Sequence, residues 1–402
     1  MKKILLGSIA ILSFAFIAEA DFDTDTIRNK KNGGYFFNEQ TSIDHNIVQN
    51  QCRTGTCWSY SSLSFFESEL IRMGKPKVNL SEMFIVRGAY IEKAKNYIRM
   101  DGKMNFGQGG AFHDILYVME RYGIVPETEY TGLNYGTDVH NHSEMSGMLQ
   151  AQLDVIKKKP QGGKLTPNWI KAVKGTVEAY LGEAPEKFTF EGKEYNPISF
   201  RDYLGIVPSD YVSLTSFTHH PFYSQFMIEV PDNWAMQMSY NLPLEEFWQV
   251  MESSLSKGYT WAWGSDVSEK GFSFRNGIGI VPTHDSLLKT KGKDNKFFSN
   301  AGSQKIGSAF DSPQPEKTIT QKMRQEGFDN KTTTDDHGMH AVGLATDQNG
   351  TKYVKIKNSW GTPNYLKGYM YISESFMKYK TINIQIHKDA IPKNIKKKLG
   401  IK

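Results

Sequence analysis

The 402-residue sequence contains only two cysteines, Cys52 and Cys57, and this scarcity excludes a scaffold held together by several disulfides. The two lie beside the same glycine-containing turn. Because Cys57 is expected to open a helix, its side chain should point away from the preceding loop, which disfavours a bridge between the pair. We therefore predict two free thiols.

The sequence also lacks a large excess of charge of one sign: 48 Lys and Arg stand against 43 Asp and Glu, a net charge of +5. A nucleic-acid-binding surface usually needs more positive charge or tighter clustering. The one dense basic run, residues 393–402, is more typical of a solvated tail than of a binding patch. We expect no nucleic-acid partner.

Long apolar runs are missing after the N-terminus. Residues 1–20 combine a Met-Lys-Lys start, an apolar stretch over 4–17 and the small-residue site Ala18-Glu19-Ala20, which is the pattern of a signal peptide. The alternative, a membrane-spanning anchor, needs about 20 apolar residues, and this run is shorter. The sequence predicts a secreted or periplasmic protein without a membrane anchor.

Patterns typical of metal and phosphate sites are lacking as well. His140, His142 and the pair His219-His220 are the metal candidates, but zinc-type spacings with cysteines or a helical histidine pair do not occur. The glycine-rich segment 107–110 lacks the lysine that follows in a phosphate-binding loop. We predict no metal and no cofactor, and a substrate-binding turn at 107–110.

The first part of the mature chain reads as helical. Apolar residues recur every three or four positions from Leu63 to Met73, which predicts a helix over 56–73 with Cys57 in its first turn. Further helices are expected to begin at Ser81 and to cover 112–122. We assign residues 21–135 to a helical lobe.

The remainder divides into an insertion and a region rich in strands. Residues 136–208 are polar and lysine-rich, with weak apolar periodicity, and we interpret them as an insertion. Strands are expected over 211–214 and 259–263, with a helix over 244–255 between them and a polar surface excursion over 289–336. Residues 209–402 are therefore assigned to a sheet-rich lobe with a basic C-terminal tail.

One β-hairpin places two polar side chains together. The Asn349-Gly350 turn signal lies between two strand-like segments. If the hairpin is centred on Asn349, His340 and Asn358 are equidistant from the centre and should face each other. His337 is the alternative partner of Asn358. Since the apolar strand starts directly after His340, we predict that His340 pairs with Asn358.

These residue types suit nucleophilic catalysis. A free thiol has a pKa of about 8.5 and needs a helix N-terminus or a positive neighbour to ionise near neutral pH. Cys57 has the helix, and a histidine oriented by the Asn358 amide would supply the base. Gln51, on the loop before Cys57, is placed to donate to an oxyanion. A lone cysteine would more often be a buried structural thiol, which is our interpretation of Cys52.

Several segments resemble those of papain-like cysteine peptidases. Residues 50–59, Asn-Gln-Cys-Arg-Thr-Gly-Thr-Cys-Trp-Ser, resemble the segment around the family's nucleophile, while 340–342 and 357–361 resemble its histidine and asparagine segments. Gly109-Gly110 is similar to the glycine pair whose backbone binds an extended peptide. The resemblance implies that four residues are catalytic and that Trp360 shields the contact between the histidine and the asparagine. The four are Gln51, Cys57, His340 and Asn358.

Within that family the closer similarity is to the bleomycin hydrolase and bacterial aminopeptidase C branch. The insertion, the segment 109–126 and residues 388–392 carry it. The resemblance implies a hexameric cage, and aminopeptidase specificity conferred by a C-terminal arm in the cleft. We expect a short arm in this chain.

The resemblance implies an α+β, papain-like two-lobed fold, in which a helical lobe faces an antiparallel sheet-rich lobe that follows a large insertion. It also implies hydrolysis of peptide bonds through a thioester acyl-enzyme, with aminopeptidase specificity and with peptides or proteins as substrates. The alternatives are an endopeptidase with an open cleft and a catalytically silent papain-like binding protein.

Overall fold

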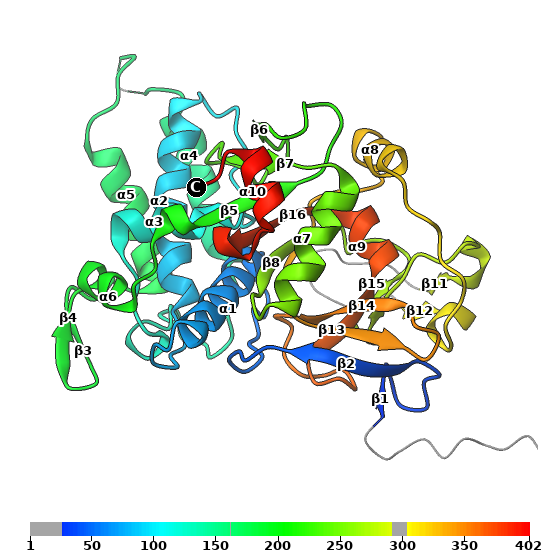
Figure 1. Cartoon of the computed structure of the whole chain (residues 1–402). Coiled ribbons are helices and arrows are strands. Elements are labelled where there is room, and N and C mark those ends of the chain that lie inside the picture. Colours follow the sequence, from blue (N-terminus) through cyan, green and yellow to red (C-terminus); the bar gives the residue numbers. More distant parts are fainter. Residues whose placement is uncertain (1–25, 161, 292–303) are drawn as a thin grey trace, which may run out of the picture.

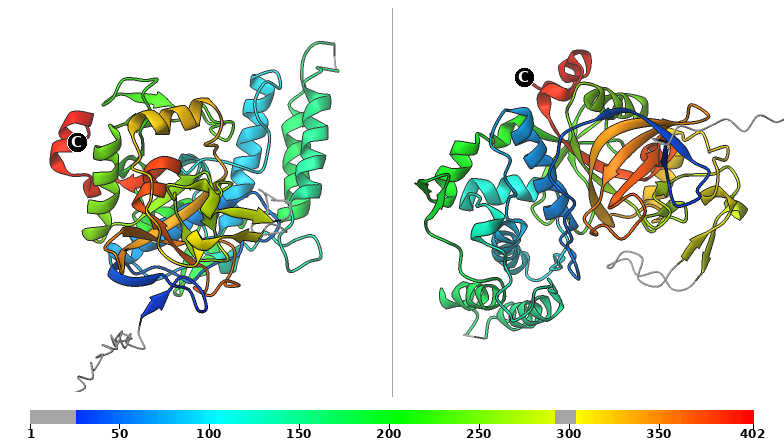
Figure 2. Two further views of the ribbon diagram at one scale, coloured as in Figure 1. Left: turned by 90° about the vertical axis from the view of Figure 1, so that its right-hand side faces the viewer. Right: turned by 90° about the horizontal axis from the view of Figure 1, so that it is seen from below.

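The computed structural model describes residues 26–160, 162–291 and 304–402; the predicted signal peptide, residues 1–20, lies outside this range. A helical lobe and a sheet-rich lobe lie side by side (Figures 1 and 2). Helix α1 (Cys57–Arg72) lies at their boundary, where it packs on the central strands of the sheet. None of the helices within the described residues has the length and apolar character needed to span a membrane.

The helical lobe confirms the three predicted helices. Besides α1, its helices are α2 (Glu82–Arg99), α3 (His113–Tyr122), α4 (Ser143–Ile156), α5 (Asn168–Leu181) and α6 (Pro197–Leu204). The Ser81 hydroxyl caps α2 by accepting the Phe84 N–H at 3.0 Å. Helix α3 ends at Gly123, whose φ of +80° favours glycine.

Residues 136–208, which we predicted to be an insertion, extend the helical lobe. Helices α4 and α5 and the hairpin of β3 (Phe188–Phe190) and β4 (Lys193–Tyr195) fall within this segment. Each helix buries every fourth residue on one face, and these side chains join the core formed by α1 and α2. They are Met145, Leu149, Leu153, Val173, Val177 and Leu181. This periodicity, which lies among lysines and glycines in the sequence, was not predicted.

The sheet-rich lobe is built on one large sheet. Its strands are β1 (Ile27–Arg28), β2 (Phe36–Ser42), β5 (Tyr211–Thr215), β6 (Gln225–Met227), β7 (Met238–Asn241), β8 (Trp261–Ser265), β9 (Phe272–Ser273), β10 (Ile278–Gly279), β13 (His337–Asp347), β14 (Lys352–Lys357), β15 (Tyr369–Ser373) and β16 (Thr381–His387). The path runs β6-β7-β5-β16-β8-β13-β14-β15-β10-β9, and β2 pairs with β13. Most pairs are antiparallel, as predicted, but β5–β7 and β10–β15 are parallel. The sheet is therefore mixed.

The remaining elements belong to the same lobe. They are α7 (Leu244–Ser256), α8 (Gln321–Asp329), α9 (Glu374–Lys380), α10 (Lys393–Leu399) and the separate hairpin of β11 (Lys289–Lys291) and β12 (Gln304–Ile306). Of these, α7 and α9 pack on the sheet. Helix α10 corrects the expectation of a solvated basic tail. Its Ile395 and Leu399, one turn apart, are buried in the core of the sheet-rich lobe, while Lys398 pairs with Glu246 at 2.5 Å. The helix lies beside α7 (Figure 1).

The β13–β14 hairpin contains a bulge that the sequence analysis did not anticipate. Near the turn the pairs follow the predicted centre, with Gly343 opposite Lys355. The register then shifts by one residue between Gly343 and Ala341, so that His340 pairs with Lys357. A one-residue shift turns side chains to the other face of a sheet. The predicted pairing of His340 with Asn358 is therefore wrong.

Truncation of Leu149 tests whether the insertion shares the lobe's core. Leu149→Ala should lower the free energy of unfolding by about 2–5 kcal/mol, because it leaves a cavity in a packed core. The matched change Val155→Ala on the same helix, where the side chain is 58% exposed, should alter it by less than about 0.5 kcal/mol. Denaturant unfolding followed by circular dichroism measures both, and equally small effects would contradict a shared core.

Candidate active site

A cleft of about 810 Å³ receives residues from both lobes. The helical lobe contributes Gln51, Cys57, Trp58 and the glycine segment 107–110, and the sheet-rich lobe contributes Asp335, Asp336, His337 and Trp360. Of the predicted site residues, Gln51, Cys57, Gly109 and Gly110 line this cleft. His340 lines a separate small cavity behind α1.

Cys57 is the first residue of α1, and its thiol is half-buried and free, as is that of Cys52. Burial raises the pKa of Cys57 to about 12; the backbone N–H of Gly338 opposes this rise, whereas the carboxylates of Asp232 and Asp335 add to it. The resting thiol therefore stays protonated at neutral pH. It needs a base to become a nucleophile.

Two of the described histidines, His113 and His337, line the cleft, and His337, at the start of β13, is the one that contacts Asn358. Its Nε2 lies 2.8 Å from Asn358 Oδ1, and its ring stacks on Trp360 with centroids 4.4 Å apart. Trp360 thus shields a histidine–asparagine contact, as the resemblance implied, but the histidine is His337. Burial lowers the pKa of His337 to about 4, while the hydrogen bond to Asn358 and the charge of Asp336 oppose this decrease.

The hydrogen bonds of Asn358 determine the tautomer of His337. Asn358 Oδ1 also accepts the N–H of Ser359 at 2.7 Å, so the oxygen and not the amide nitrogen must face this donor. An oxygen can only accept, so Nε2 of His337 carries the proton and donates it. The other ring nitrogen, Nδ1, keeps its lone pair, which makes it the atom able to take the thiol proton.

His340 cannot serve the same purpose, because it faces α1 and is 0% exposed. Ser64 Oγ accepts an N–H of the Lys357 ammonium at 2.8 Å and is hydrogen-bonded to His340 Nδ1 at 2.9 Å. Burial lowers the pKa of His340 well below its ordinary value, and the charge of Lys357 adds to this. His340 is therefore a neutral core residue, and its predicted placement beside Asn358 is corrected by the bulge in β13.

Gln51 is positioned by the segment that carries Asn358. Its Oε1 accepts the Ser359 hydroxyl at 2.7 Å, and its Nε2 donates one hydrogen to the carbonyl oxygen of Thr54 at 2.7 Å. The second Nε2 hydrogen is left for a ligand in the cleft. The N–H of Cys57 belongs to the first turn of α1, where backbone donors have no partner within the helix. Ser359, which supports both Gln51 and Asn358, was missed by the sequence analysis.

The glycine segment forms one wall of the cleft. Trp58 Nε1 donates to the Gln108 carbonyl oxygen at 3.0 Å, and a Cβ built on Gly110 would lie 2.9 Å from the Trp58 ring. A Cβ on Gly109 would collide with the carboxylate of Asp232. Only glycine leaves room for both neighbours. No local motif signalled Asp232, which lies far from the segment in sequence.

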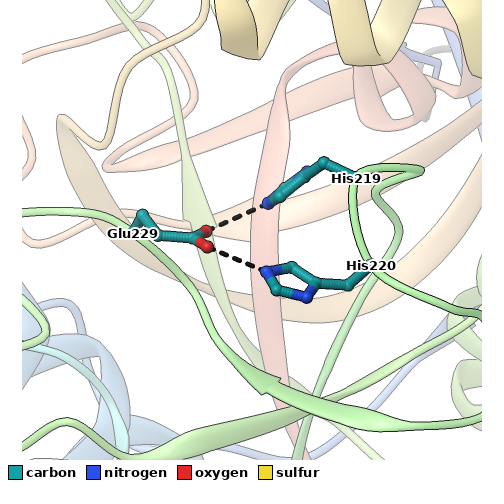
Figure 3. A group of neighbouring side chains, drawn as sticks. All are labelled: His219, His220 and Glu229. Carbon is teal, nitrogen blue, oxygen red and sulfur yellow. Dashed lines mark hydrogen bonds and ion pairs between the residues drawn. The ribbon is translucent and has the colours of Figure 1, made fainter.

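The strongest candidate for a metal site among the described residues consists of His219, His220 and Glu229. The histidine pair was considered from the sequence, but its contact with Glu229 was not predicted. Nε2 of His219 and Nε2 of His220 lie 3.0 and 2.9 Å from the two carboxylate oxygens of Glu229 (Figure 3). Gln325 Nε2 donates to Nδ1 of His219 at 3.0 Å while its Oε1 accepts the Thr218 N–H. His219 therefore carries its proton on Nε2, without a lone pair for a metal. The two histidines thus hold Glu229, and with it the loop after β6, through hydrogen bonds.

A cysteine at the start of a helix thus shares a cleft with a histidine that an asparagine orients, and the two lobes that supply them have the architecture of papain-like cysteine peptidases. The chain belongs to the Peptidase C1-like family, whose model matches residues 17–297 and 308–401. It is a cysteine peptidase, as the resemblance implied.

Known proteins similar to this chain include bacterial aminopeptidases. Aminopeptidase C of Lactobacillus delbrueckii subsp. lactis is 25% identical over 408 residues, covering 88% of this chain and 82% of the relative. Aminopeptidase C of Lactococcus lactis subsp. lactis is 23% identical over 380 residues, covering 86% and 81%. The crystal structure of pepw from Lactobacillus rhamnosis has a TM-score of 0.69 at 20% identity, covering 90% of this chain and 84% of that one. The predicted fold and the branch are confirmed.

Replacement of His337 tests which histidine serves Cys57. In His337→Ala, Cys57 keeps the raised pKa that burial causes and loses its base, so its alkylation by iodoacetamide at pH 7 should slow by at least about tenfold. His340→Gln, which keeps a polar partner for Ser64, should leave the rate within about twofold. Mass spectrometry of each cysteine measures the rates, with Cys52 as internal reference. If the alkylation of Cys57 slowed only in the His340 variant, the assignment of His337 as the base would be contradicted.

Proposed function

We propose that this chain is a cysteine aminopeptidase in which Cys57 is the nucleophile, His337 the general base and acid, Asn358 the residue that orients His337, and Gln51 an oxyanion donor. The observation that carries this proposal is the 2.8 Å contact of Asn358 with His337, which lines the same cleft as Cys57. The names of the bacterial relatives support the aminopeptidase part.

In the acylation step, Nδ1 of His337 takes the thiol proton as Sγ of Cys57 attacks the substrate carbonyl carbon. The carbonyl oxygen becomes an oxyanion that the Gln51 Nε2–H and the Cys57 N–H stabilise. The intermediate collapses when the C–N bond breaks, and the leaving nitrogen takes the proton from His337. The products of this step are a free amine and a thioester on Cys57.

In the deacylation step, His337 removes a proton from water, which attacks the thioester carbonyl. The C–S bond breaks, a carboxylic acid leaves, and the proton on His337 returns to the sulfur. The positive charge that His337 carries in between is stabilised by Asn358 Oδ1 and by the carboxylate of Asp336. Because the pKa of His337 is low, the neutral base is present at pH values well below 7.

Experiment can distinguish the two alternatives that the sequence left open, an endopeptidase and a catalytically silent binding protein. An endopeptidase would cleave peptides whose N-terminus is blocked as readily as free ones. A silent binding protein would cleave neither. The intact hydrogen-bond network around His337 and Gln51 favours catalysis over silence.

Hydrolysis of fluorogenic peptide amides tests the function. Cys57→Ala should lower kcat/KM by at least about a thousandfold, because the nucleophile is lost. Cys52→Ala is the matched control, since its thiol bonds only a nearby carbonyl oxygen, and it should retain activity within about twofold. Equal activity of the Cys57 variant, or no hydrolysis by the wild-type protein under reducing conditions, would contradict the proposal.

We propose also that residues 1–20 direct export and are removed, so that the mature protein begins at Asp21. N-terminal sequencing of the protein recovered outside the cytoplasm should read Asp-Phe-Asp-Thr. Recovery of an uncleaved chain in the cytoplasm alone would contradict this.

A further inference from the structure

The described residues hold only one half of the Asn358 amide. Its Oδ1 accepts hydrogen bonds from His337 Nε2 and from the Ser359 N–H. Its Nδ2 has no hydrogen-bond partner among the described residues and is shielded from bulk solvent, since Asn358 is only 2% exposed. A buried amide nitrogen without a partner is costly, and native structures rarely leave one. The hydrogens on Nδ2 therefore need an acceptor.

A small cavity behind α1 adjoins this amide. Its volume is about 10 Å³, and Asn358 and His340 both line it. His340 Nε2 is another buried polar atom without a hydrogen-bond partner in the described part of the chain, and His340 itself is 0% exposed. A polar cavity of roughly 10–15 Å³ holds one water molecule when it offers that water two or more partners. Asn358 Nδ2 and His340 Nε2 are two such partners.

The remaining lining of the cavity supplies acceptors. Glu67 on α1 and Glu82 on α2 both line it, and they are 4% and 5% exposed. Each carboxyl group has at least one oxygen that accepts a hydrogen bond, whether or not it is protonated. A water that donates to these acceptors presents its own lone pairs to a donor, and Asn358 Nδ2 is a donor. The cavity thus complements the half of the amide that the described residues leave unbonded.

His340 is fixed from its other side by a hydrogen-bonded network between helix and sheet. Ser64 Oγ, on α1, is bonded to Lys357 Nζ at 2.8 Å and to His340 Nδ1 at 2.9 Å. The charge of Lys357 opposes the rise that burial causes in the pKa of Glu67, and the charge of Glu67 opposes the fall that burial causes in the pKa of Lys357. The imidazole therefore has a defined position, as a group that orients a catalytic side chain requires.

The orientation of the Asn358 amide decides whether His337 has a usable base. A flipped amide would turn Nδ2 toward His337 Nε2, the imidazole would then carry its proton on Nδ1, and the base would be lost. We propose that His340 is a positioning residue for the reaction: through one buried water it holds Asn358 Nδ2 and thereby keeps Oδ1 turned toward His337. The role in catalysis rests on the proposed peptidase function.

Two variants of His340 test this role by kinetics. His340→Leu cannot bond the water, so kcat for a fluorogenic peptide amide should fall by at least about tenfold, because the base loses its orientation. KM should stay within about twofold, since His340 does not line the cleft. His340→Gln, which offers an amide in place of the imidazole, should restore kcat to within about twofold of the wild-type value.

Val354→Ala is the matched control for a loss of stability. Val354 is 0% exposed and lies on β14 in the core of the sheet-rich lobe, so its truncation destabilises the lobe without changing the cavity. Its kcat should stay within about twofold of the wild-type value at a temperature where the variant is folded. An unchanged kcat in His340→Leu, or equal losses in the Leu and Gln variants, would overturn the inference.

Two further measurements do not depend on activity. A crystal structure of the wild-type protein should show one ordered water within hydrogen-bond distance of Asn358 Nδ2 and His340 Nε2, and His340→Leu should lack this water. In proton NMR, the signal of the His337 Nε2–H, identified by its loss in His337→Ala, should persist in His340→Gln and broaden or vanish in His340→Leu.

These measurements separate the inference from the proposed function. A dry cavity in the wild-type crystal, or a His337 signal that His340→Leu leaves unchanged, would overturn the inference while Cys57-dependent hydrolysis stands. If the water and the NMR signal behave as expected but the wild-type protein hydrolyses no peptide, the proposed function is wrong and the positioning of Asn358 by His340 is supported.

Discussion

The hydrogen bond between His337 Nε2 and Asn358 Oδ1 is the contact on which the active site depends. It determines which ring nitrogen of His337 carries the proton and so leaves Nδ1 as the base. Asn358 in turn is oriented by the Ser359 N–H, and the Ser359 hydroxyl holds Gln51. One short segment after β14 therefore orients both the base and the oxyanion donor, although these act from different lobes.

Burial sets the electrostatics of this arrangement. Cys57 and His337 lie in surroundings that disfavour charge on either group, which raises the pKa of the thiol and lowers that of the imidazole. The charged forms become favourable only when a proton passes from Cys57 to His337, which creates a thiolate and an imidazolium together. The N–H of Gly338 stabilises the first and the oxygen of Asn358 the second.

Much of the fold follows from local sequence signals, whereas the detail of the site does not. The apolar spacing after Cys57 and the Ser81 cap are local, so α1 and α2 could be predicted closely. The hairpin of β13 and β14 and the centre of its turn could also be predicted from the sequence. The bulge was not, because β13 bulges where β2 packs closely, and a Cβ on Gly343 would collide with the carbonyl oxygen of Thr41. Because of this bulge, His337 contacts Asn358 in the place where the sequence predicted His340. Asp232 could not be found either, since only the folded chain brings it to Gly109.

The most direct test of the central claim, that His337 and not His340 faces Cys57, is chemical cross-linking with a 1,3-dihaloacetone. This short reagent alkylates a thiol and then an adjacent imidazole nitrogen, and fragmentation in the mass spectrometer locates both ends. The account predicts a bridge from Cys57 Sγ to His337. A bridge to His340, or an adduct on Cys57 that never closes onto a histidine, would contradict it.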